Sequence, residues 1–498
     1  MCRPCGTCYR FYKTIIGYLF FIPIHNFQIV NKKKKFLKRS EKIAFDLKHR
    51  ETIRYNISKY DMAFEVGKSR YQRLDSAKNS ASLIKRYAIK NLTLLLKTFE
   101  NSAVNNGIEL LWAQNSHEVI EYLKKIALES DIKKVVKSKS MTTEEIDFNE
   151  EFEKIGIKSV ETDLGEFIVQ TAGEKPYHIL TPAMHKSRKD VATLFNQHFG
   201  TPKDSSAEEL VTYARKHLRQ DFEEAQMGIT GANFLLAREG AVSLTENEGN
   251  GLFSLSFPKI HVVIAGIEKI IPSIEDLDLF LPLLGCHGTG QQVTVYNSIV
   301  FGPRKNDEKN GPERMIVILL DNGRTNLSKK TVQSEALSCI RCGACLNNCP
   351  VYKNIGGYTY DAVYTGPIGS VIMPHLGNFK ELNHLSFACS LCGKCYENCP
   401  VKINLPELLL ENRYEAVKKT GRPLTEKIIF SGMTLMLRSA ILLDIVNGSV
   451  KTFFSNLISN KIYGKRRLSQ KFAKKSFRKQ WKRSLLFEQP IKKKIAEK

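Results

Sequence analysis

Apolar residues recur every three to four positions between residues 41 and 105, and this spacing predicts a helical region early in the chain. From residue 106 onward, short apolar runs alternate with helix-like segments. The predicted strands are 108–113, 133–138, 157–162 and 178–183, and the predicted helices are 116–129, 142–155, a segment ending near 172, and 187–198. This alternation indicates an α/β domain with a mainly parallel sheet.

Residues 228–330 contain more strand-like runs, each bounded by Gly, Pro, Asn or Asp. These runs read ANFLLA, GAVSLTE, HVVIAGI, QQVTVYNS and ERMIVILLD. We therefore predict one α/β domain over residues 106–330, preceded by a helical N-terminal region at 36–105. A chain of 498 residues is long enough for two or three domains with separate cores.

After this domain the sequence repeats one cysteine pattern, C-x2-C-x2-C-x3-C-P. The two copies, CIRCGACLNNCP and CSLCGKCYENCP, contain Cys339, Cys342, Cys345, Cys349, Cys389, Cys392, Cys395 and Cys399. In bacterial two-cluster ferredoxins, three thiolates of such a run hold one [4Fe–4S] cluster and the fourth ligates the other. Thiolates also suit zinc, but a structural zinc site needs only four ligands, usually as two CxxC pairs. The duplication and the trailing Cys-Pro favour two iron–sulfur clusters, so we predict a protein that transfers electrons.

We expect the clusters in a helical ferredoxin-like domain at 336–410, where an ordered loop, GGYTYDAVYTGPIG, leads into a helix. Residues 411–498 follow as a basic helical C-terminal region. Its apolar stretch 428–447 carries Arg438 and Asp444, which disfavour a membrane-spanning helix. We expect this stretch to pack on the body or on a partner, and a position in a membrane interface is the alternative.

The net charge of +24 resides in the two ends of the chain. Residues 1–40 carry nine Lys or Arg and no acid, and residues 421–498 carry nineteen basic against four acidic residues. The body is therefore neutral, and we predict no nucleic-acid partner. The C-terminal arm is a candidate for peripheral contact with an anionic membrane, through binding that weakens with salt, and a solvated tail is the alternative.

Residues 1–35 are interpreted as a basic and apolar extension outside the fold. Its apolar run at 15–24 contains a proline and is too short to span a bilayer, and KKKK at 32–35 replaces a signal-peptide cleavage site. Cys2, Cys5 and Cys8 lack a fourth ligand before a proline, so we expect no third cluster there. Cysteines at ligand spacing in a large chain indicate a reducing compartment. We predict a cytoplasmic protein, with the inner face of the membrane as its candidate contact.

Several longer stretches are specific enough to compare with known families: MGITGANFLLAREGAVSLTENEGNG (227–251), GIEKIIPSIEDL (266–277), FGPR (301–304), LDNGRT (320–325) and the two cysteine motifs. The chain resembles the lactate utilisation protein B family from about residue 36 to KSFRKQW at 475–481. The resemblance implies a LUD α/β domain, similar in fold to CoA-transferases and ribose-phosphate isomerases, followed by a helical ferredoxin module.

The resemblance also implies that the eight motif cysteines are cluster ligands. By the crossing rule, one cluster takes Cys339, Cys342, Cys345 and Cys399, and the other takes Cys349, Cys389, Cys392 and Cys395. It implies two partners in a lactate-oxidising system: a redox subunit rich in cysteine motifs and a small LUD protein. Arg341 and Lys394 bring positive charge into the two loops and are expected to favour the reduced clusters, or to act only as solubilising charge.

Two functions are compatible with these features. The first is a non-catalytic electron-transfer subunit of an L-lactate dehydrogenase complex, which relays electrons from the oxidation of lactate to pyruvate through two [4Fe–4S] clusters. The alternative is a self-sufficient iron–sulfur oxidoreductase whose LUD domain binds and converts a small 2-hydroxy acid or thioester. No dinucleotide fingerprint and no P-loop occurs in the sequence.

The acidic turn Thr245–Gly251 provides the catalytic candidates for the alternative, Glu246 and Glu248, which could bind a hydroxy acid or activate a nucleophile. Capping and turn hydrogen bonds are the structural explanation of the same residues. His185, Arg188, Arg304 and Arg324 are candidates for gripping a carboxylate, or ordinary structural residues. His287 beside Cys286 does not make a metal site.

Overall fold

The computed structural model describes residues 29–421, 424–439, 441, 444, 446–462, 471–482 and 484. Asn31–Ala416 form one compact unit, and a second unit comprises Met1–Val30 and Val417–Lys498. The α/β domain and both cysteine motifs belong to the first unit. The Cys2, Cys5 and Cys8 group and residues 1–28 of the predicted extension lie outside the described residues. Residues 29–35, which were expected to lie outside the fold, begin helix α2, and Lys32 and Lys35 pair with Glu381 at 2.7 Å and Asp361 at 2.8 Å.

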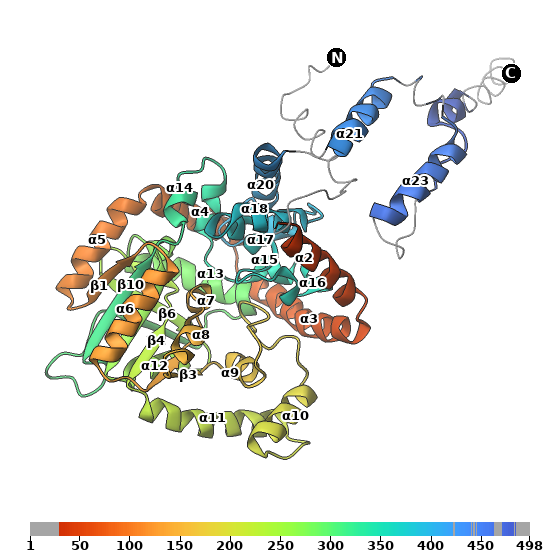
Figure 1. Cartoon of the computed structure of the whole chain (residues 1–498). Helices are drawn as coiled ribbons and strands as arrows, with labels where there is room; N and C mark the ends of the chain where they lie inside the picture. The colour runs from red at the N-terminus through yellow and green to blue at the C-terminus, as the bar shows by residue number, and fades with distance from the viewer. Residues whose placement is uncertain are drawn as a thin grey trace. The chain divides into compact units, whose positions relative to one another are not determined.

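A six-stranded sheet forms the centre of the α/β domain (Figure 1). All of its paired strands are parallel, in the order β1-β10-β7-β4-β2-β3. The strands are β1 (Glu109–Ala113), β2 (Lys134–Lys137), β3 (Lys158–Glu161), β4 (Met227–Thr230), β7 (Ile260–Gly266) and β10 (Arg314–Leu320). The predicted α/β class with a mainly parallel sheet is confirmed.

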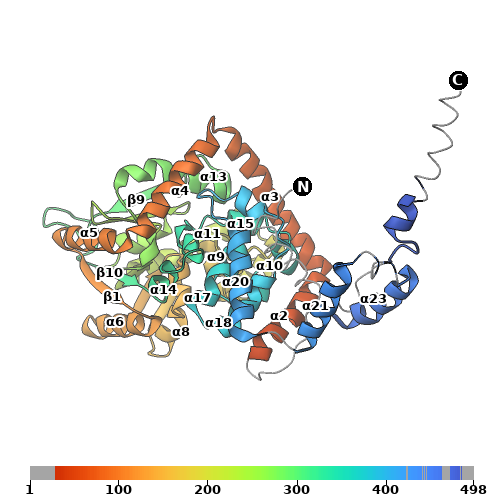
Figure 2. The same ribbon diagram turned by 90° about the horizontal axis from the view of Figure 1, so that it is seen from above.

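Strand β10 shows how the sequence covers both faces of this sheet. Ile316, Ile318 and Leu320 pack into one core with α6 (Ser116–Glu129) and α8 (Phe148–Glu153). The alternate residues Met315 and Val317 pack into another core with α5 (Leu92–Asn105). Figure 2 shows α5 and α6 on opposite sides of the strands. Because strand side chains alternate and both faces are buried, residues 315–320 of β10 are all apolar, and only its first residue, Arg314, is charged.

The other elements of the domain are a second sheet and further helices, and some of them share a hydrophobic core with the cysteine motifs. A second sheet has the order β8-β5-β6-β9 and consists of β5 (Phe234–Leu236), β6 (Ala241–Glu246), β8 (Ile270–Ile271) and β9 (Tyr296–Val300). The other helices of the domain are α7 (Met141–Glu145), α9 (Leu164–Thr171), α10 (Arg188–Phe199), α11 (Ala207–Glu224), α12 (Asn250–Ser256), α13 (Leu277–Thr289) and α14 (Arg324–Ser328). Gly228 allows α12 to approach β4 closely, because a Cβ atom there would lie 1.7 Å from the Ser254 carbonyl oxygen.

Helices precede and follow the α/β domain, as the periodicity predicts. The N-terminal region contains α2 (Ile29–Ala44), α3 (Leu47–Ser69) and α4 (Leu74–Lys90) in addition to α5. The cysteine-containing region contains α15 (Ala344–Asn347), α16 (Tyr352–Ile355), α17 (Gly366–Leu376), α18 (Phe379–Leu382), α19 (Lys394–Glu397) and α20 (Leu405–Thr420). The expected loop before α17 is present, and one buried core contains motif cysteines together with apolar residues of α13 and α17.

Two further sequence predictions differ from the structure. The predicted strand 178–183 is a turn, because the ring nitrogen Nδ1 of His178 accepts hydrogen bonds from the amides of Leu180 and Thr181 and bends the chain. The predicted helix 142–155 is two helices, α7 and α8. The chain breaks at Asp147, which has φ 49°, and Ile146 and Phe148 on either side of it enter the same core.

The second unit contains α21 (Leu424–Leu437) and α23 (Gly448–Ile462) among its described residues. The predicted apolar stretch 428–447 coincides in part with α21. None of the helices in the described ranges is long and apolar enough to cross a membrane.

Candidate functional site

The two cysteine loops have the same backbone conformation. Arg341 and Leu391, each two residues after the first cysteine of its motif, have φ 62° and 56°, and Gly343 and Gly393 have φ 73° and 82°. The amide of Arg341 lies 3.4 Å from the sulfur of Cys339, and the amide of Leu391 lies 3.2 Å from that of Cys389. Amides directed at sulfur stabilise thiolates, so each loop is shaped for cluster ligands.

The fourth cysteine of each motif receives a similar hydrogen bond. The amide of Tyr352 donates to Cys349 at 3.5 Å, and the amide of Ile403 donates to Cys399 at 3.3 Å. Both acceptors are buried. Hydrogen bonds to the sulfur atoms are one of the means by which a protein tunes an iron–sulfur cluster.

Four of the motif cysteines line one small cavity: Cys349 of the first motif with Cys389, Cys392 and Cys395 of the second. The fourth cysteine of the first motif therefore lies beside the first three of the second motif. We call these four the second group, and the remaining four, Cys339, Cys342, Cys345 and Cys399, the first group; members of both groups belong to one hydrophobic core. Among the described residues, no three His, Cys, Asp or Glu side chains are placed to hold a single metal ion.

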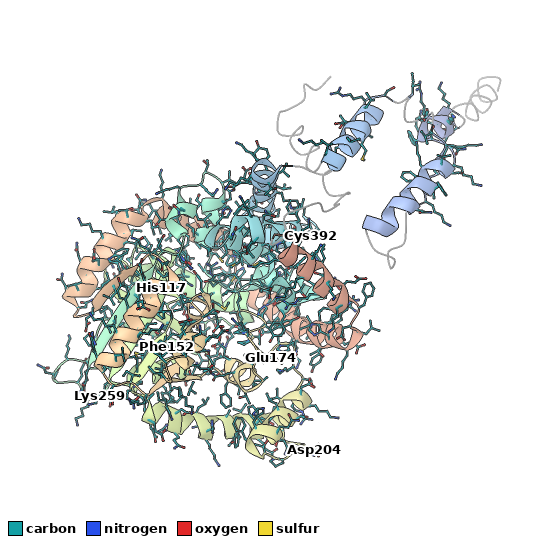
Figure 3. All side chains as sticks on the ribbon, viewed as in Figure 1. His117, Phe152, Glu174, Asp204, Lys259 and Cys392 are labelled. Atoms are coloured by element: carbon teal, nitrogen blue, oxygen red, sulfur yellow. The ribbon has the colours of Figure 1, made fainter. Side chains whose placement is uncertain are left out.

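The two groups differ in their exposure to solvent. Residues 342–344 of the first loop are buried, whereas Ser390, Cys392 and Lys394 of the second loop are exposed. Figure 3 labels Cys392, which comes from the segment just before α19. The second group is therefore the one that a molecule in solution reaches first.

A buried network of charges connects the first cysteine loop to the α/β domain. The Arg341 guanidinium group donates to Glu268 at 3.1 Å, and Glu268 also binds Arg324 at 2.5 Å. Arg324 makes two further bonds, of 2.8 Å each, to the carboxylate of Glu145, which also accepts from the hydroxyl of Tyr364 at 2.9 Å. Burial opposes ionisation of Glu268, but Arg324 and Arg341 outweigh it and lower its pKa to about 2.

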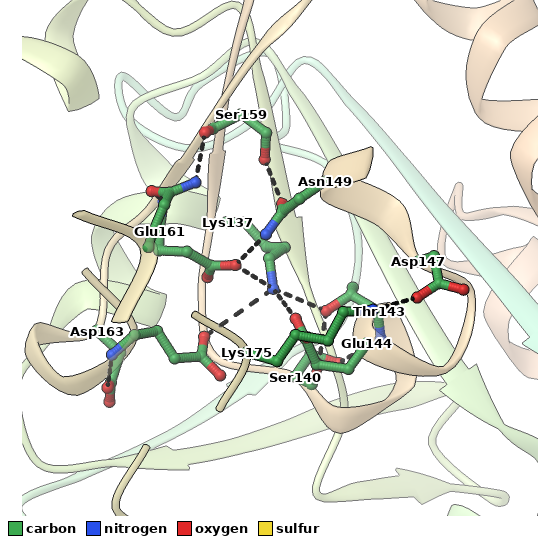
Figure 4. A network of polar contacts seen from close by, with 12 residues as sticks. Lys137, Ser140, Thr143, Glu144, Asp147, Asn149, Ser159, Glu161, Asp163 and Lys175 are labelled. Carbon is green, nitrogen blue, oxygen red and sulfur yellow. Dashed lines mark hydrogen bonds and ion pairs between the residues drawn. The ribbon is translucent and has the colours of Figure 1, made fainter. Parts of the chain in front are cut away.

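A second buried network lies at the carboxyl ends of β2 and β3 (Figure 4). The ammonium group of Lys137 lies 2.7 Å from Glu161, 3.2 Å from Glu144 and 4.0 Å from Glu166. Burial lowers the pKa of Lys137, but Glu161 and Glu144 outweigh it and raise that pKa above its ordinary value. Burial and then Glu161 raise the pKa of Glu166 well above the ordinary value. Ligands of parallel α/β sheets commonly bind at this edge.

The predicted acidic turn lies at the same edge of the sheet, and its two carboxylates have different surroundings. Glu246 accepts hydrogen bonds from the amides of Gly251 at 2.6 Å and Leu252 at 2.8 Å, at the start of α12. Glu248 accepts one from the amide of Leu164 at 3.0 Å. Desolvation of its carboxylate and the neighbouring Asp163 raise the pKa of Glu248 to about 7. The contacts of Glu246 are those of a helix cap.

A cavity of about 600 Å³ is lined by residues of three parts of the chain. Met141 and Glu144 come from α7, Arg39 and Lys42 come from α2, and residues 357–359, 361–363 and 365 come from the loop between the two motifs. Glu144 therefore reaches both the cavity and Lys137. A volume of this size is within the range of small-molecule sites.

The other predicted candidates do not converge on one site. His185 Nε2 lies 2.6 Å from Glu174, Arg188 donates to the Ser205 carbonyl at 2.7 Å, and Arg304 pairs with Glu313 at 2.9 Å. His287 Nδ1 bonds the carbonyl of Leu283 at 2.8 Å within its own helix. Arg324 alone belongs to the buried network beside the first cysteine loop.

Sequence reasoning did not single out Lys137, Glu144, Glu161 or Glu166. A signal was present, because Lys137 and Glu161 are charged residues at the ends of predicted strands, and strand ends of a parallel sheet meet at one edge. The partners from α7 and α9 could not be found in this way, since their proximity depends on how the helices pack.

Comparison with protein families divides the chain into the same two parts as the structure, an α/β domain and a region with the cysteine motifs. A LUD domain matches residues 96–320, and a 4Fe-4S dicluster domain matches residues 335–403. The chain is therefore a LUD-domain iron–sulfur protein with a C-terminal dicluster region.

Curated relatives identify the family more closely. "Lactate utilization protein B" of Bacillus licheniformis is 40% identical over 377 residues, which cover 74% of this chain and 79% of the relative. The protein of the same name from Bacillus subtilis is 41% identical over 354 residues, which cover 71% and 74%. The chain belongs to the lactate utilization protein B family.

One solved structure, a DUF162 family protein from Deinococcus radiodurans, matches 46% of this chain and 98% of its own with 12% identity and a TM-score of 0.27. A similarity of this size carries no argument about the fold or the function.

Proposed function

We propose that this protein is the electron-transfer subunit of an L-lactate-oxidising complex and carries two [4Fe–4S] clusters. One cluster is held by Cys339, Cys342, Cys345 and Cys399, and the other by Cys349, Cys389, Cys392 and Cys395. The observation that carries the proposal is that Cys349 of the first motif lines one small cavity with Cys389, Cys392 and Cys395 of the second motif, in two loops of matching backbone. A fourth ligand that comes from the opposite motif is the arrangement of two-cluster ferredoxins.

When bound, the two clusters supply one-electron carriers, so together they hold the two electrons that one lactate releases. The chain supports this use in three ways: amide donors reach the sulfur of Cys339, Cys349, Cys389 and Cys399, the first group is shielded from solvent, and Cys392 leaves the second group open to an electron acceptor. We infer that electrons leave through the exposed group. The partners proposed are a cysteine-rich redox subunit and a small LUD protein, in the cytoplasm or at its membrane face.

The proposal is tested by anaerobic purification of the tagged protein from its own host, followed by electron paramagnetic resonance with and without L-lactate. When the co-purified subunits are present, we expect signals of reduced clusters after lactate is added. With this chain alone we expect no such signals, because the proposed electron-transfer subunit does not itself oxidise the hydroxyl group of lactate. Reduction of the isolated chain by lactate would transfer the substrate chemistry to the LUD domain. Clusters that react with dithionite and never with lactate would contradict lactate as the donor.

The alternative, a LUD domain with substrate chemistry of its own, is favoured by one observation. Glu248 and Asp163 lie together at the carboxyl edge of the sheet, and the pKa of Glu248 rises to about 7, where a carboxyl group can accept and return protons. We keep this function as the second candidate, with Glu246 as the other carboxylate of the same turn.

Substitutions of these two glutamates distinguish the candidates. Under the electron-transfer proposal, Glu248→Gln and Glu246→Gln should retain full iron content and the wild-type rate of lactate-dependent cluster reduction in the complex. Loss of a catalytic acid or base lowers rates by roughly 10²–10⁴-fold. A loss of that size in Glu248→Gln, with iron content intact, would favour the alternative, and Glu275→Gln at an exposed ion pair is the matched control.

A further inference from the structure

The two cysteine loops differ at one equivalent position in a way that matters for electron transfer. Arg341 and Leu391 occupy the same place in the motif, have similar positive φ angles and direct their amides at the first sulfur of the loop. Because the backbones agree, the difference lies in the side chain. One loop carries a cation there, and the other carries an apolar group.

The guanidinium group of Arg341 is held in the interior. Its side chain is 9% exposed, Nη2 donates to Glu268 at 3.1 Å, and the group lies 4.5 Å from the centre of the Tyr364 ring. In the described part of the chain, Nε and Nη1 have no hydrogen-bond acceptor. Buried donors without acceptors are uncommon in native proteins. A cluster held by Cys339 would bring sulfur acceptors to this loop and would so account for these two donors.

The basic side chains near the pair of Arg341 and Glu268 differ from Arg341. The ammonium group of Lys85 donates to the carbonyls of Glu268 at 2.7 Å and Ile270 at 3.2 Å. Burial lowers the pKa of Lys85 to about 7 and that of Lys269 to about 8, which weakens both as cations. Glu268 opposes the charge of Arg341, but it is shared between Arg341 and Arg324. Arg341 is therefore the permanent cation that the first cysteine loop itself brings to this region.

The second loop brings no cation to the equivalent position, because Leu391 stands where the first loop has Arg341. Arg413 packs nearby but donates to the carbonyls of Ser386 and Cys389, and Lys394 extends into solvent, where its charge is screened.

We propose that Arg341 separates the reduction potentials of the two clusters and holds the cluster at Cys339 at the higher potential. The proposal rests on the two-cluster function above. Each cluster gains one electron on reduction and becomes more negative by one charge, so a buried cation stabilises the reduced form. Burial alone acts in the opposite direction, since a low dielectric disfavours the more negative state. The same low dielectric strengthens the attraction to Arg341, which outweighs that cost.

This assignment sets the order in which the two clusters take up electrons. The inner cluster, next to the LUD domain, fills first, and the outer cluster at Cys392 fills second and exchanges electrons with the acceptor. A position that differs between two otherwise matching loops thus determines where the first electron resides.

The test is a redox titration of the anaerobically purified full chain, with dithionite as reductant and electron paramagnetic resonance as the readout. Signals are assigned with Cys342→Ala and Cys392→Ala, each of which retains one cluster. Arg341→Leu copies the residue of the second loop, and we expect it to lower the potential of the inner cluster enough to change its ratio of reduced to oxidised form by about tenfold, or ~59 mV. The outer cluster should not shift.

Three further variants complete the test. Arg341→Lys keeps the charge and should restore most of the potential of the inner cluster. Lys394→Leu removes an exposed cation of the other loop and should change neither potential. Leu391→Arg adds a cation to the second loop and should raise the potential of the outer cluster, so it tests the proposal even if Arg341→Leu binds less than its full iron. Unchanged potentials in fully loaded Arg341→Leu, or in Leu391→Arg, would overturn the proposal. A wild-type chain that binds no iron–sulfur cluster would instead contradict the proposed function.

Discussion

Replacing Cys392 with alanine should remove the outer cluster and about half of the iron and acid-labile sulfide of the chain, because each cluster depends on its four thiolates. Cys342→Ala should remove the inner cluster to the same extent. The two variants should differ in stability. Cys392 is exposed, whereas Cys342 is 7% exposed within the core shared with α13 and α17, so its loss also disturbs packing. Iron, sulfide and the visible absorption of anaerobically purified protein measure the effect.

Cys286 provides the matched control for both substitutions. It is fully buried, lies outside both motifs and packs against α3 near Gly67. Cys286→Ala removes a buried thiol of the same size, so it should leave iron and sulfide at the wild-type level. Full iron content in Cys342→Ala or Cys392→Ala would contradict the assignment of that cysteine as a ligand.

Replacing Arg324 with methionine should destabilise the protein by about 3–5 kcal/mol, the usual cost of removing one partner from a buried ion pair. The Arg324 side chain is 1% exposed and bridges Glu145 and Glu268, which are 5% and 1% exposed. Its loss leaves two buried carboxylates with fewer cations. The measurement is the urea midpoint of unfolding at equal cluster content.

The same variant should change the dependence of stability on pH. The pKa of Glu268 is about 2 in the folded protein and 4.5 ordinarily, so this carboxylate stabilises the wild type fully above pH 4.5 and loses its contribution as the pH falls towards 2. Without Arg324 the folded pKa rises and that contribution shrinks.

Arg238→Met is the control for the loss of an arginine. Arg238 is 60% exposed and pairs with the exposed Glu275, so its removal should leave the urea midpoint nearly unchanged. Equal effects of the two substitutions would show that the Arg324 network contributes no more than a surface pair.

Much of the fold follows from local patterns. The helix at 116–129 has the predicted bounds, and five of the six strands of the parallel sheet correspond to predicted apolar runs. Where prediction failed, a tertiary or side-chain contact overrode the local pattern. His178 bends the chain by accepting two amide hydrogen bonds, and Asp147 breaks a helix so that Ile146 and Phe148 can both be buried.

The sequence by itself determined the cysteine spacing, the α/β class and the family, because each is a matter of residue order along the chain. Only the tertiary structure decided which thiols face one another, that Cys342 is buried while Cys392 is exposed, and that Arg341 meets Glu268 from a loop 73 residues away. It also decided that the ammonium group of Lys137 lies within 4.0 Å of three glutamate carboxylates. These features depend on burial and on distances between remote segments, and the energy of a charge depends on both.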